Sequence, residues 1–509
     1  MFKKTLLLSL ATSSLLATNG INLIGTSTVS RSMGGTGVAF YSHATEAMHK
    51  NIALIGDVQK DEFQFDMTYF NATLSSSVRD DNPLNETNSN GATISASTQN
   101  HLDTNFVPSM TYVTKVDDEV AFGIAMIGAA GMAVDYKGEY SHRQLKSSMM
   151  LMKIIPAVSY RQGNVTFGFA PVLGLGSMSL NYDERYIDPE TGKPYPAGTK
   201  PQSQREGLFG TNIGGDSLVP AFGFTTGIDI KVTEKLRVGA TYNSSLKYTY
   251  SEVTNFKQFG PHGMVYMADE YAGGALSSLA DQSIKGNNDL IAALEAAGLD
   301  NSTAQTVVSL MPDGTISESL ALTNPDTLHD LTLEQPFEIA VGFSYELTKK
   351  MTITGDYRYI PWELTEGYGE FGWKNQHVFA VGAEYKAKNY SLRFGYNYAN
   401  SPLESVTNEF GSLVSDVQGH YIFDQALSML NMLGFPAIST THFSAGFGYA
   451  INKDIDLDFA MVYSPESTVS RDGTLLPLDK VYEGLSIFNY AYETKMQQLS
   501  LSGGINYRF

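Results

Sequence analysis

Three arginines lie where a cation can bind an acidic group. Each belongs to a segment of alternating polar and apolar residues, in opposite phase to the apolar residue beside it. They are Arg237, Arg358 and Arg393. A guanidinium binds a carboxylate through paired, charge-assisted hydrogen bonds. Two interpretations stay open: the arginines balance acids of the same interior, such as Glu338, Asp356 or Asp456, or they bind the acidic head group of an amphiphilic ligand. Arg358 and Arg393 are the candidates for the ligand.

Other reactive patterns are missing from the sequence. It has no cysteine, so it can form neither a disulfide nor a thiolate metal site. It has no Gly-x-Ser-x-Gly elbow and no His-Glu-x-x-His, and its 9 histidines are scattered. The stretch Gly34-Gly35-Thr36-Gly37 lacks the preceding strand, the third motif glycine and the following lysine of a phosphate-binding loop. We therefore expect a protein that is not an enzyme and that has no cofactor and no metal site.

The balance of charge is strongly negative. The chain has 34 Lys and Arg against 53 Asp and Glu, which gives a net charge of -19. Nucleic-acid binding needs clustered cations along the phosphate path, so we expect no nucleic-acid partner. Acidic stretches such as Asp117-Asp118-Glu119 lie mostly in apparent turns and loops. They are interpreted as solvated loop surface, and the alternative is that divalent cations bridge them to anionic lipid head groups.

The first residues predict export. Lys3 and Lys4 precede an apolar stretch, residues 6–16, and the small residue Ala17 ends it. This is the pattern of a signal peptide, and the apolar stretch is too short to cross a bilayer as a helix. We assign residues 1–17 to the signal and exclude them from the fold.

The composition of the remaining chain favours a membrane protein built from strands. Its sequence has no run of about 18 apolar residues, which excludes a bundle of membrane helices. Only 42% of the residues are hydrophobic and the mean hydropathy is -0.14. A membrane β-barrel is compatible with these values because its strands alternate. The 29 Tyr and 27 Phe, against 2 Trp, fit aromatic girdles at the two membrane interfaces.

Alternating segments joined by tight turns predict strands along the whole chain. Residues 499–509 alternate without a break and end at an aromatic residue, Phe509, on the apolar face. The other expected strands are 63–69, 106–116, 120–128, 150–160, 165–180, 219–232, 236–250, 337–347, 351–360, 377–385, 390–398, 442–451 and 455–463. The total is about fourteen, an even number, as in single-chain bacterial barrels.

The connections between these strands alternate in length. Short turns lie at one end and long loops at the other, as in barrels with brief periplasmic turns and extended extracellular loops. Two of the long loops contain helical patterns, at residues 290–297 and 303–310 in one and at 422–433 in the other. Their apolar residues, among them Phe423 and Leu427, are either packing faces of the loops or contacts for an apolar molecule.

We therefore expect an all-β fold, a transmembrane antiparallel β-barrel of about 14 strands spanning residues 61–509. Its place is the outer membrane of a Gram-negative bacterium, in contact with lipid and lipopolysaccharide. Residues 18–60 precede the first strand and are neither strand-like nor of low complexity. Because the lumen of such a ring is too wide for side chains alone to fill, we expect this segment to plug it as a hatch. The candidate hatch residues are Arg31, Gly34, Gly35 and Asn51.

Several of these features together resemble the FadL/TodX family of outer-membrane transporters for long-chain fatty acids and other hydrophobic compounds. They include the start Asn19-Gly20-Ile21, the small residues around Arg31 and Gly35, the terminal Phe509 and the number of strands. Further matches are Leu392-Arg393-Phe394-Gly395-Tyr396 and Phe435-Pro436-Ala437. The resemblance covers essentially the whole mature chain. One motif departs from it, because Asn51-Ile52-Ala53 stands where the family has Asn-Pro-Ala.

The resemblance implies transport by diffusion without an energy source. A hydrophobic ligand is captured among the outer loops, enters a pocket above the hatch and leaves sideways beside an inward-kinked third strand. Here that strand is 120–128, and Gly128 and Gly131 would let it bend. The alternative is that the strand simply ends in a loop. Met33 and Phe40 of the hatch are the candidates for the apolar part of the ligand site.

Two other functions remain open from the sequence. A general porin for small polar solutes would also have polar lumen faces and acidic loops. A surface adhesin or receptor would act through its long loops. The hatch separates the first of these from a transporter, because an open channel does not need a structured segment before its first strand. The family's plugged barrels imply that one chain suffices, so we expect a monomer.

Overall fold

A computed structural model describes most of the chain. The described residues are 18–80, 94–99, 104–135, 143–184, 187–188, 193–194, 212–254, 279, 284, 286–309, 329–369, 371–403, 430–474 and 489–509. The expected signal, residues 1–17, and most of the expected helix 422–433, with Phe423 and Leu427, lie outside these ranges. In the described part of the chain, no helix is long and apolar enough to span a bilayer.

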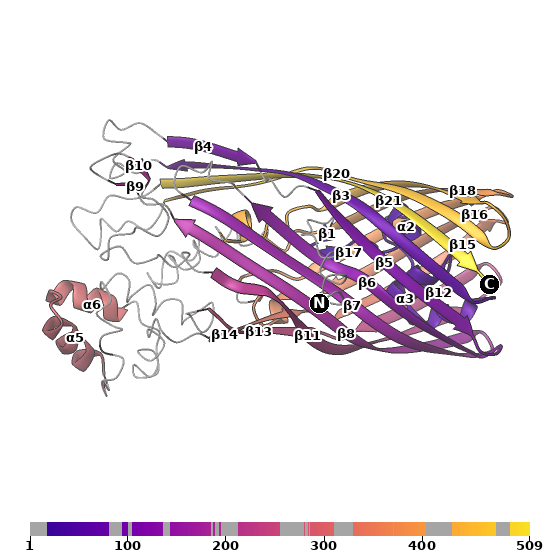
Figure 1. Ribbon diagram of the computed structural model, residues 1–509, viewed down its shortest axis with the longest axis horizontal. Coiled ribbons are helices and arrows are strands. Elements are labelled where there is room, and N and C mark those ends of the chain that lie inside the picture. Colours follow the sequence, from indigo (N-terminus) through magenta and orange to yellow (C-terminus); the bar gives the residue numbers. More distant parts are fainter. Residues whose placement is uncertain are drawn as a thin grey trace, which may run out of the picture.

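The described strands form a closed antiparallel barrel of 14 strands (Figure 1), which confirms the expected fold class. The wall strands before the middle of the chain are β3 (Glu62–Asp80), β4 (Ile94–Gln99), β5 (Thr104–Lys115), β6 (Val120–Asp135), β7 (Arg143–Gln162), β8 (Val165–Glu184), β11 (Asn212–Lys231) and β12 (Leu236–Asn243). Those after it are β15 (Glu338–Thr348), β16 (Met351–Ile360), β17 (Gln376–Lys386), β18 (Tyr390–Ala399), β19 (Thr441–Ala450), β20 (Ile455–Thr474) and β21 (Asn489–Arg508). Because β4 and β5 both pair with β3, they count as one interrupted strand.

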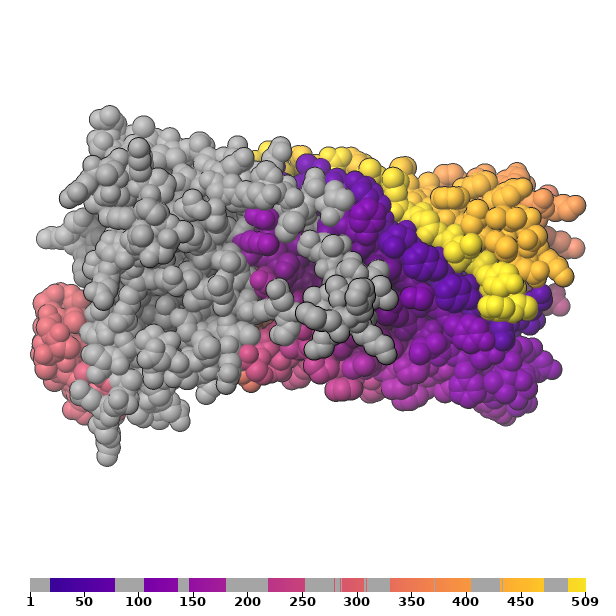
Figure 2. All heavy atoms as spheres, viewed as in Figure 1, coloured from indigo at the N-terminus to yellow at the C-terminus, as the bar shows by residue number. Residues whose placement is uncertain are grey.

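The last strand closes the ring against the first. Strand β21 pairs with β3 from Tyr490↔Asp80 to Arg508↔Glu62, and Figure 2 shows the yellow C-terminal residues directly beside the indigo ones. The alternation expected for residues 499–509 is present. Leu501 and Ile505 are exposed on the outer face, and Ser500 and Asn506 are buried inside. An apolar outer face is the surface that a barrel presents to lipid.

Many strands are longer than their sequence pattern predicts. Strand β3 ends at Asp80 rather than at residue 69, and β20 ends at Thr474 rather than at 463. The added segments contain Ser75-Ser76-Ser77 and similar polar runs, which lack the lipid-facing alternation on which the prediction relied. The expected single strand 236–250 is wrong in another way. It is divided at Ser244 and Ser245 into β12 and β13 (Leu246–Thr254), and β13 pairs only with β14 (His329–Gln335).

The helical patterns expected in one long loop are confirmed. Helix α5 (Asn287–Ala296) and helix α6 (Asn301–Ser309) form a hairpin, and Gly298, with a φ of +105°, ends the first of them. The apolar residues of the two helices bury one another: Leu290, Leu294, Ala304 and Val308 share one small core. These residues therefore form a packing face. In the other loop, the π-helix η7 (Leu430–Gly434) is the described part of the expected helix. A small ribbon of β9 (Ile187–Asp188) and β10 (Lys193–Pro194) completes the outer part.

The segment before β3 lies inside the ring (Figure 1). It consists of the hairpin β1 (Thr18–Asn19) and β2 (Asn22–Leu23), the helices α2 (Thr28–Ser32) and α3 (Ala44–Lys50), and the 3₁₀ helix η1 (Ile52–Asp57). Almost every residue from 19 to 58 is buried, including many polar ones. We call this segment the hatch. The short 3₁₀ helix η4 (Trp362–Leu364) lies beyond the outer end of β16.

Candidate functional site

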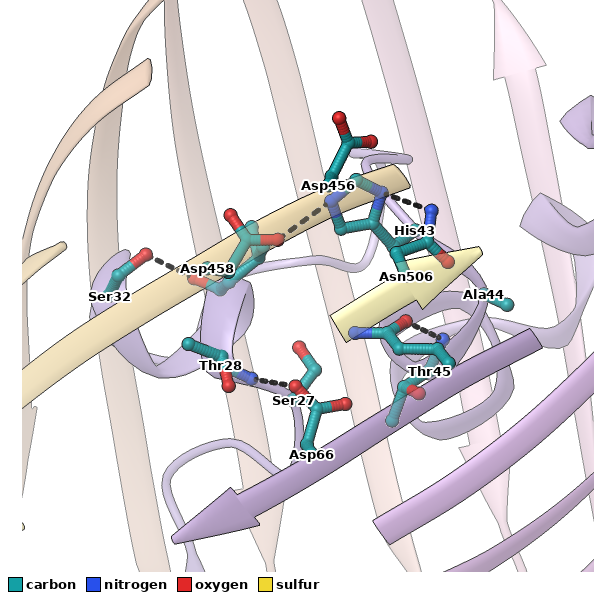
Figure 3. A network of polar contacts seen from close by, with 12 residues as sticks. Ser27, Thr28, Ser32, His43, Ala44, Thr45, Asp66, Asp456, Asp458 and Asn506 are labelled. Carbon is teal, nitrogen blue, oxygen red and sulfur yellow. Dashed lines mark hydrogen bonds and ion pairs between the residues drawn. The ribbon is translucent and has the colours of Figure 1, made fainter. Parts of the chain in front are cut away.

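Helix α2 fixes one half of the hatch to the barrel wall. The Ser27 side chain caps the helix by accepting from the Ser30 amide at 3.0 Å. The amide of Thr28 donates to Asp66 of β3 at 2.9 Å (Figure 3). Arg31, a predicted hatch residue, donates to the carbonyl oxygen of Gly25 at 3.0 Å and to Ser500 of β21 at 2.7 Å. The helix is thereby tied to the strands that close the barrel.

Gly34 and Gly35, the next two predicted hatch residues, have backbone conformations that favour glycine. Their φ angles are +69° and +83°. A Cβ atom at Gly35 would collide with the carbonyl oxygen of Ile24, and one at Gly34 would collide with the backbone of Tyr396 in β18. The amide of Gly34 also donates to Ser444 of β19 at 2.9 Å. Gly34 therefore lets the hatch backbone lie directly on the wall, and Gly35 lets it pack against an earlier part of the hatch.

Asn51 ties the end of helix α3 to the opposite wall. Its Nδ2 donates to the carbonyl oxygen of Val38 at 2.7 Å and to that of Ile228 in β11 at 3.0 Å, while its Oδ1 caps η1 at the Ala53 amide. Earlier in the hatch, the amides of Gly37 and Val38 donate to Asp356 of β16 at 2.8 and 3.1 Å. Together with helix α2, these contacts fasten the hatch around the ring.

A charged cluster lies between the hatch and the strands near the short turns (Figure 3). His43 contacts Asp458 at 3.0 Å, and Arg393 binds both Asp458 at 2.6 Å and Glu384 at 2.8 Å. Burial opposes the charge on His43, yet Asp458 and other nearby acids raise its pKa to about 9. The Glu46 carboxyl is buried with no hydrogen-bond partner among the described residues, and burial raises its pKa to about 8. The cluster holds His43 as a cation and Glu46 largely as a neutral acid.

A second charged contact fixes the end of the hatch. Asp57 of η1 accepts from Lys231 at 2.9 Å and pairs with Arg161 and Arg237, while Arg237 also binds Asp229 at 2.5 Å. Burial alone would raise the pKa of Asp57, but the three cations keep it lowered. Arg237 is thus balanced by acids.

Strand β6 leaves its neighbour part-way through the wall. Its ladder with β5 ends at Ser109↔Ile127, and an irregularity between Gly128 and Ala130 leaves Ala129 as an extra residue against β7. Residues 129–134 are buried on both faces of the strand, whereas residues 120–128 alternate between more and less buried positions. Hatch residue Asn22 pairs with Ala130 in place of β5. The outer part of β6 therefore bends into the lumen and meets the hatch.

Cations line the lumen next to this bend. Lys153 of β7 pairs with Ile127, is half-buried and has no ion pair within 4.0 Å among the described residues. Arg358 contacts Glu338 at 3.4 Å, and its Nε and Nη2 have no hydrogen-bond partner among those residues. On the hatch, burial and the nearby Arg358 lower the pKa of Lys50 to about 7. Among the described residues the group has one ion pair, Arg358 with Glu338, and Asp356 also lies near Lys50 and Arg358.

An aromatic cluster covers the lumen on the outer side of the hatch. Trp362 and Trp373 are buried with ring centroids 5.0 Å apart, and Tyr368 lies 5.0 and 4.9 Å from them. The indole nitrogen of Trp362 donates to Gln376 at 2.8 Å. Such rings form an apolar surface with fixed polar edges.

Comparison with known proteins decides the family. The sequence model of the outer membrane transport proteins (OMPP1/FadL/TodX) matches residues 8–411. The chain belongs to this FadL/TodX family. No curated protein sequence matches the chain. The family places it among outer-membrane transport channels for hydrophobic compounds and not among enzymes.

Solved structures agree with the FadL/TodX fold. A Pseudomonas aeruginosa FadL homologue covers 96% of this chain and 100% of its own, at 14% identity and a TM-score of 0.57. The P. putida toluene transporter TodX covers 96% and 99%, at 13% identity and a TM-score of 0.54. The Ralstonia pickettii toluene transporter TbuX covers 96% and 99%, at 17% identity and a TM-score of 0.52.

The structure separates the two arginines predicted for a FadL-type ligand. Arg358 lies two residues from the outer end of β16, whereas Arg393 lies three residues from the short-turn end of β18. Both side chains face the lumen as expected, but Arg393 is paired with two acids beside the hatch. Met33 is buried against Gly382 of β17, and Phe40 is half-buried. Their contact with ligand stays a prediction.

Sequence reasoning missed several residues of this FadL/TodX site. Lys153 is the single cation in the otherwise mostly apolar expected strand 150–160. A lone cation in such a strand indicates a lumen-facing position, and this could have been predicted from the sequence. His43 and Asp57 gave no such signal, because their partners come from strands far away in the chain. The hatch residue Asn22 was equally hidden, since its pairing with β6 depends on the bend.

Proposed function

We propose that this chain carries hydrophobic compounds passively across the outer membrane. The compound is captured among the outer loops, enters a lumen pocket above the hatch, and leaves sideways through the wall between β5 and β6. The observation that carries the proposal is the end of the β5–β6 ladder at Ser109↔Ile127, with β6 bent inward beyond it. An interrupted ladder in a membrane barrel exposes backbone groups that lipid cannot satisfy. The unpaired segment between β5 and β6 therefore supports a role for this place as an exit.

The hatch supports this route over a porin. Its backbone and side chains are hydrogen-bonded to strands around the ring, from Asp66 and Ser500 to Asp356 and Ile228. A straight path for water and ions through the barrel axis would have to break these contacts. We therefore favour lateral release of an apolar solute, from a monomer in direct contact with lipid and lipopolysaccharide. We also propose residues 1–17 as its export signal.

The cations beside the bend favour an amphiphilic acid as the transported compound. Among the described residues, Lys153, Arg358 and Lys50 face two acids, Glu338 and Asp356, so one cation is in excess while Lys50 is protonated. A long-chain fatty acid would place its carboxylate among these cations and its chain against the aromatic cluster. Aromatic or aliphatic hydrocarbons are the alternative within the same function. TodX and TbuX are described as toluene transporters.

Binding of palmitate and hexadecane to the purified protein tests this proposal. Lys153→Met should weaken palmitate binding about tenfold, because hydrogen bonds to charged groups contribute about 1.5–3 kcal/mol, and should leave hexadecane binding unchanged. Lys495→Met, which removes an exposed cation of β21, is the matched control. If Lys153→Met weakened the binding of palmitate and of hexadecane equally, the proposal that the transported compound is an acid would be wrong. If the protein bound neither compound and showed a large steady ion conductance, the transport proposal would be wrong and the protein would be a porin.

A further inference from the structure

The hairpin of β13 and β14 leaves the barrel wall and turns one face inward. The β11–β12 ladder ends at Thr225↔Asn243, and Ser244 still donates its amide to the Phe224 carbonyl at 2.9 Å. Beyond this point, among the described strands, β13 pairs with β14 alone. Tyr248 and Tyr250 are 1% exposed, whereas the alternating residues between and beside them are exposed. The two tyrosines therefore point into the barrel from a strand that is no longer part of its wall.

Two glycines of β8 accommodate these tyrosine rings. A Cβ atom at Gly174 would collide with the Tyr248 hydroxyl, and one at Gly176 would lie 3.0 Å from the Tyr250 hydroxyl. Both phenol groups therefore lie directly on the lumen face of β8. The close approach fixes where the hydroxyl groups are.

Neither hydroxyl has a hydrogen-bond partner among the described residues, although both oxygen atoms are buried. The hydroxyl of the neighbouring Tyr368 donates to the Met149 sulfur at 3.0 Å. Tyr248 and Tyr250 belong to the main cluster of buried hydrophobic residues, together with Trp362 and Met132. Buried polar groups in folded proteins nearly always have partners, because an unsatisfied group destabilises the fold. Packing alone accounts for the rings, which phenylalanine would also supply, but not for the hydroxyls.

The two hydroxyls lie level with the bend in β6, as the register of β8, β7 and β6 shows. Gly174 pairs with Lys153, and Lys153 pairs with Ile127, the last residue of the β5–β6 ladder. Met149, which Tyr368 contacts, pairs with Met132 in the bent part of β6. The tyrosines and the bend therefore lie at the same level of the wall, where the proposed exit begins.

We infer that Tyr248 and Tyr250 are specificity-determining residues that donate hydrogen bonds to an oxygen atom at the polar end of the transported molecule. The site thus selects hydrophobic molecules that carry an oxygen acceptor, charged or neutral, over hydrocarbons of the same length. This inference rests on the proposed transport function. It differs from the cation site at Lys153 because a neutral alcohol also satisfies it.

Equilibrium binding of hexadecan-1-ol and hexadecane to the full-length protein in detergent tests the inference. The double variant Tyr248→Phe/Tyr250→Phe keeps both rings and should weaken alcohol binding about threefold to tenfold for each hydrogen bond lost. Hexadecane binding should not change. Tyr396→Phe, which alters a lipid-facing tyrosine of β18, is the control and should affect neither compound. Each single variant should show part of the loss.

Two results would overturn the inference. In one, the double variant binds the alcohol as tightly as the wild type does. In the other, it loses affinity for the alcohol and for hexadecane to the same extent. Both leave the proposed transport function intact, because the wild type still binds a hydrophobic compound. A wild-type protein that binds neither compound would refute the transport function itself.

Discussion

Asn22 of the hatch pairs with Ala130 of β6, the residue directly after the extra residue Ala129. The amide of Gly131 also donates to the Ile21 carbonyl at 3.4 Å. The first hairpin of the hatch thus takes part of the place that β5 occupies lower in the wall. This contact connects the hatch to β6, the strand beside the proposed exit. A movement of the hatch would therefore also move β6.

The geometry of the seam between β5 and β6 can be tested with cysteines, since the chain has none of its own. A Cβ atom at Gly128 lies 3.9 Å from the Cβ of Val107, which suits a disulfide. We expect Val107→Cys/Gly128→Cys to form one under mild oxidation, read as a mobility shift reversed by reductant. The single-cysteine variants are controls. A double variant that stays reduced would contradict the placement of β6.

Removal of the hatch should open the barrel. In planar bilayers we expect the intact protein to show little steady conductance, and a variant lacking residues 19–51 to show large, stable channels, because a ring of this size encloses an aqueous lumen when unfilled. A variant lacking residues 288–308, the helical hairpin of one outer loop, is the control and should stay closed. Similar low conductance from both deletions would mean that the hatch does not seal the pore.

The hatch should loosen as the pH rises. Burial raises the pKa of Glu46 to about 8, and acids near His43 raise its pKa to about 9 against the effect of burial. Relative to the unfolded chain, Glu46 lowers the stability of the docked hatch as the pH rises from about 4.5 to about 8, and the contribution of His43 is lost between about pH 6.5 and pH 9, so the decline is steepest between about pH 6.5 and pH 8. Lys50, with a pKa lowered to about 7, opposes the trend.

The charged groups that face Glu46 and His43 come from the wall strands, and they are Glu62, Asp66, Arg393, Asp458 and Arg508, whose Nη2 lies 3.5 Å from His43 Nδ1. We expect the leak conductance of the intact protein to increase over this range. Glu46→Gln, which cannot ionise, should reduce the increase. A leak that is constant or falls with rising pH would rule out these two residues as the cause.

Arg393 should stabilise the barrel more than it serves a ligand. Its side chain is 4% exposed and binds Glu384 and Asp458, and Arg393→Met would leave Glu384 buried without its cation and Asp458 with His43 alone. We expect the free energy of unfolding in urea to fall by about 3–5 kcal/mol. Lys495→Met, which breaks the exposed pair with Glu493, should cost at most about 1 kcal/mol. Equal losses for the two variants would show that the buried cluster contributes no more than a surface pair.

The sequence predicted the parts of the fold that depend on local alternation. The strands and the lumen-facing positions of Arg358 and Arg393 follow from residue parity, and the helices of one loop follow from the helical spacing of its apolar residues. The partners of these arginines do not, because they depend on strand register. Arg393 binds Glu384 and Asp458, whereas Asp456, an expected partner, binds Arg508 at 2.5 Å.

The remaining misses have a common physical cause. The inward turn of the β13–β14 hairpin and the pairing of Asn22 with β6 are set by packing between segments far apart in the chain. Tyr248 and Tyr250 follow the same alternation as the strand before them. Their sequence therefore cannot show that the strand leaves the wall.

Deletion of Ala129 tests the central claim most directly. Without its extra residue, β6 can continue its ladder with β5 along residues 104–108, which closes the wall. The measurement is uptake of labelled palmitate by cells that express the wild type or the deletion variant, with binding to the purified proteins measured in parallel. The proposed exit predicts that the variant still binds palmitate but takes up no more than cells without the protein. Uptake equal to that of the wild type would contradict it.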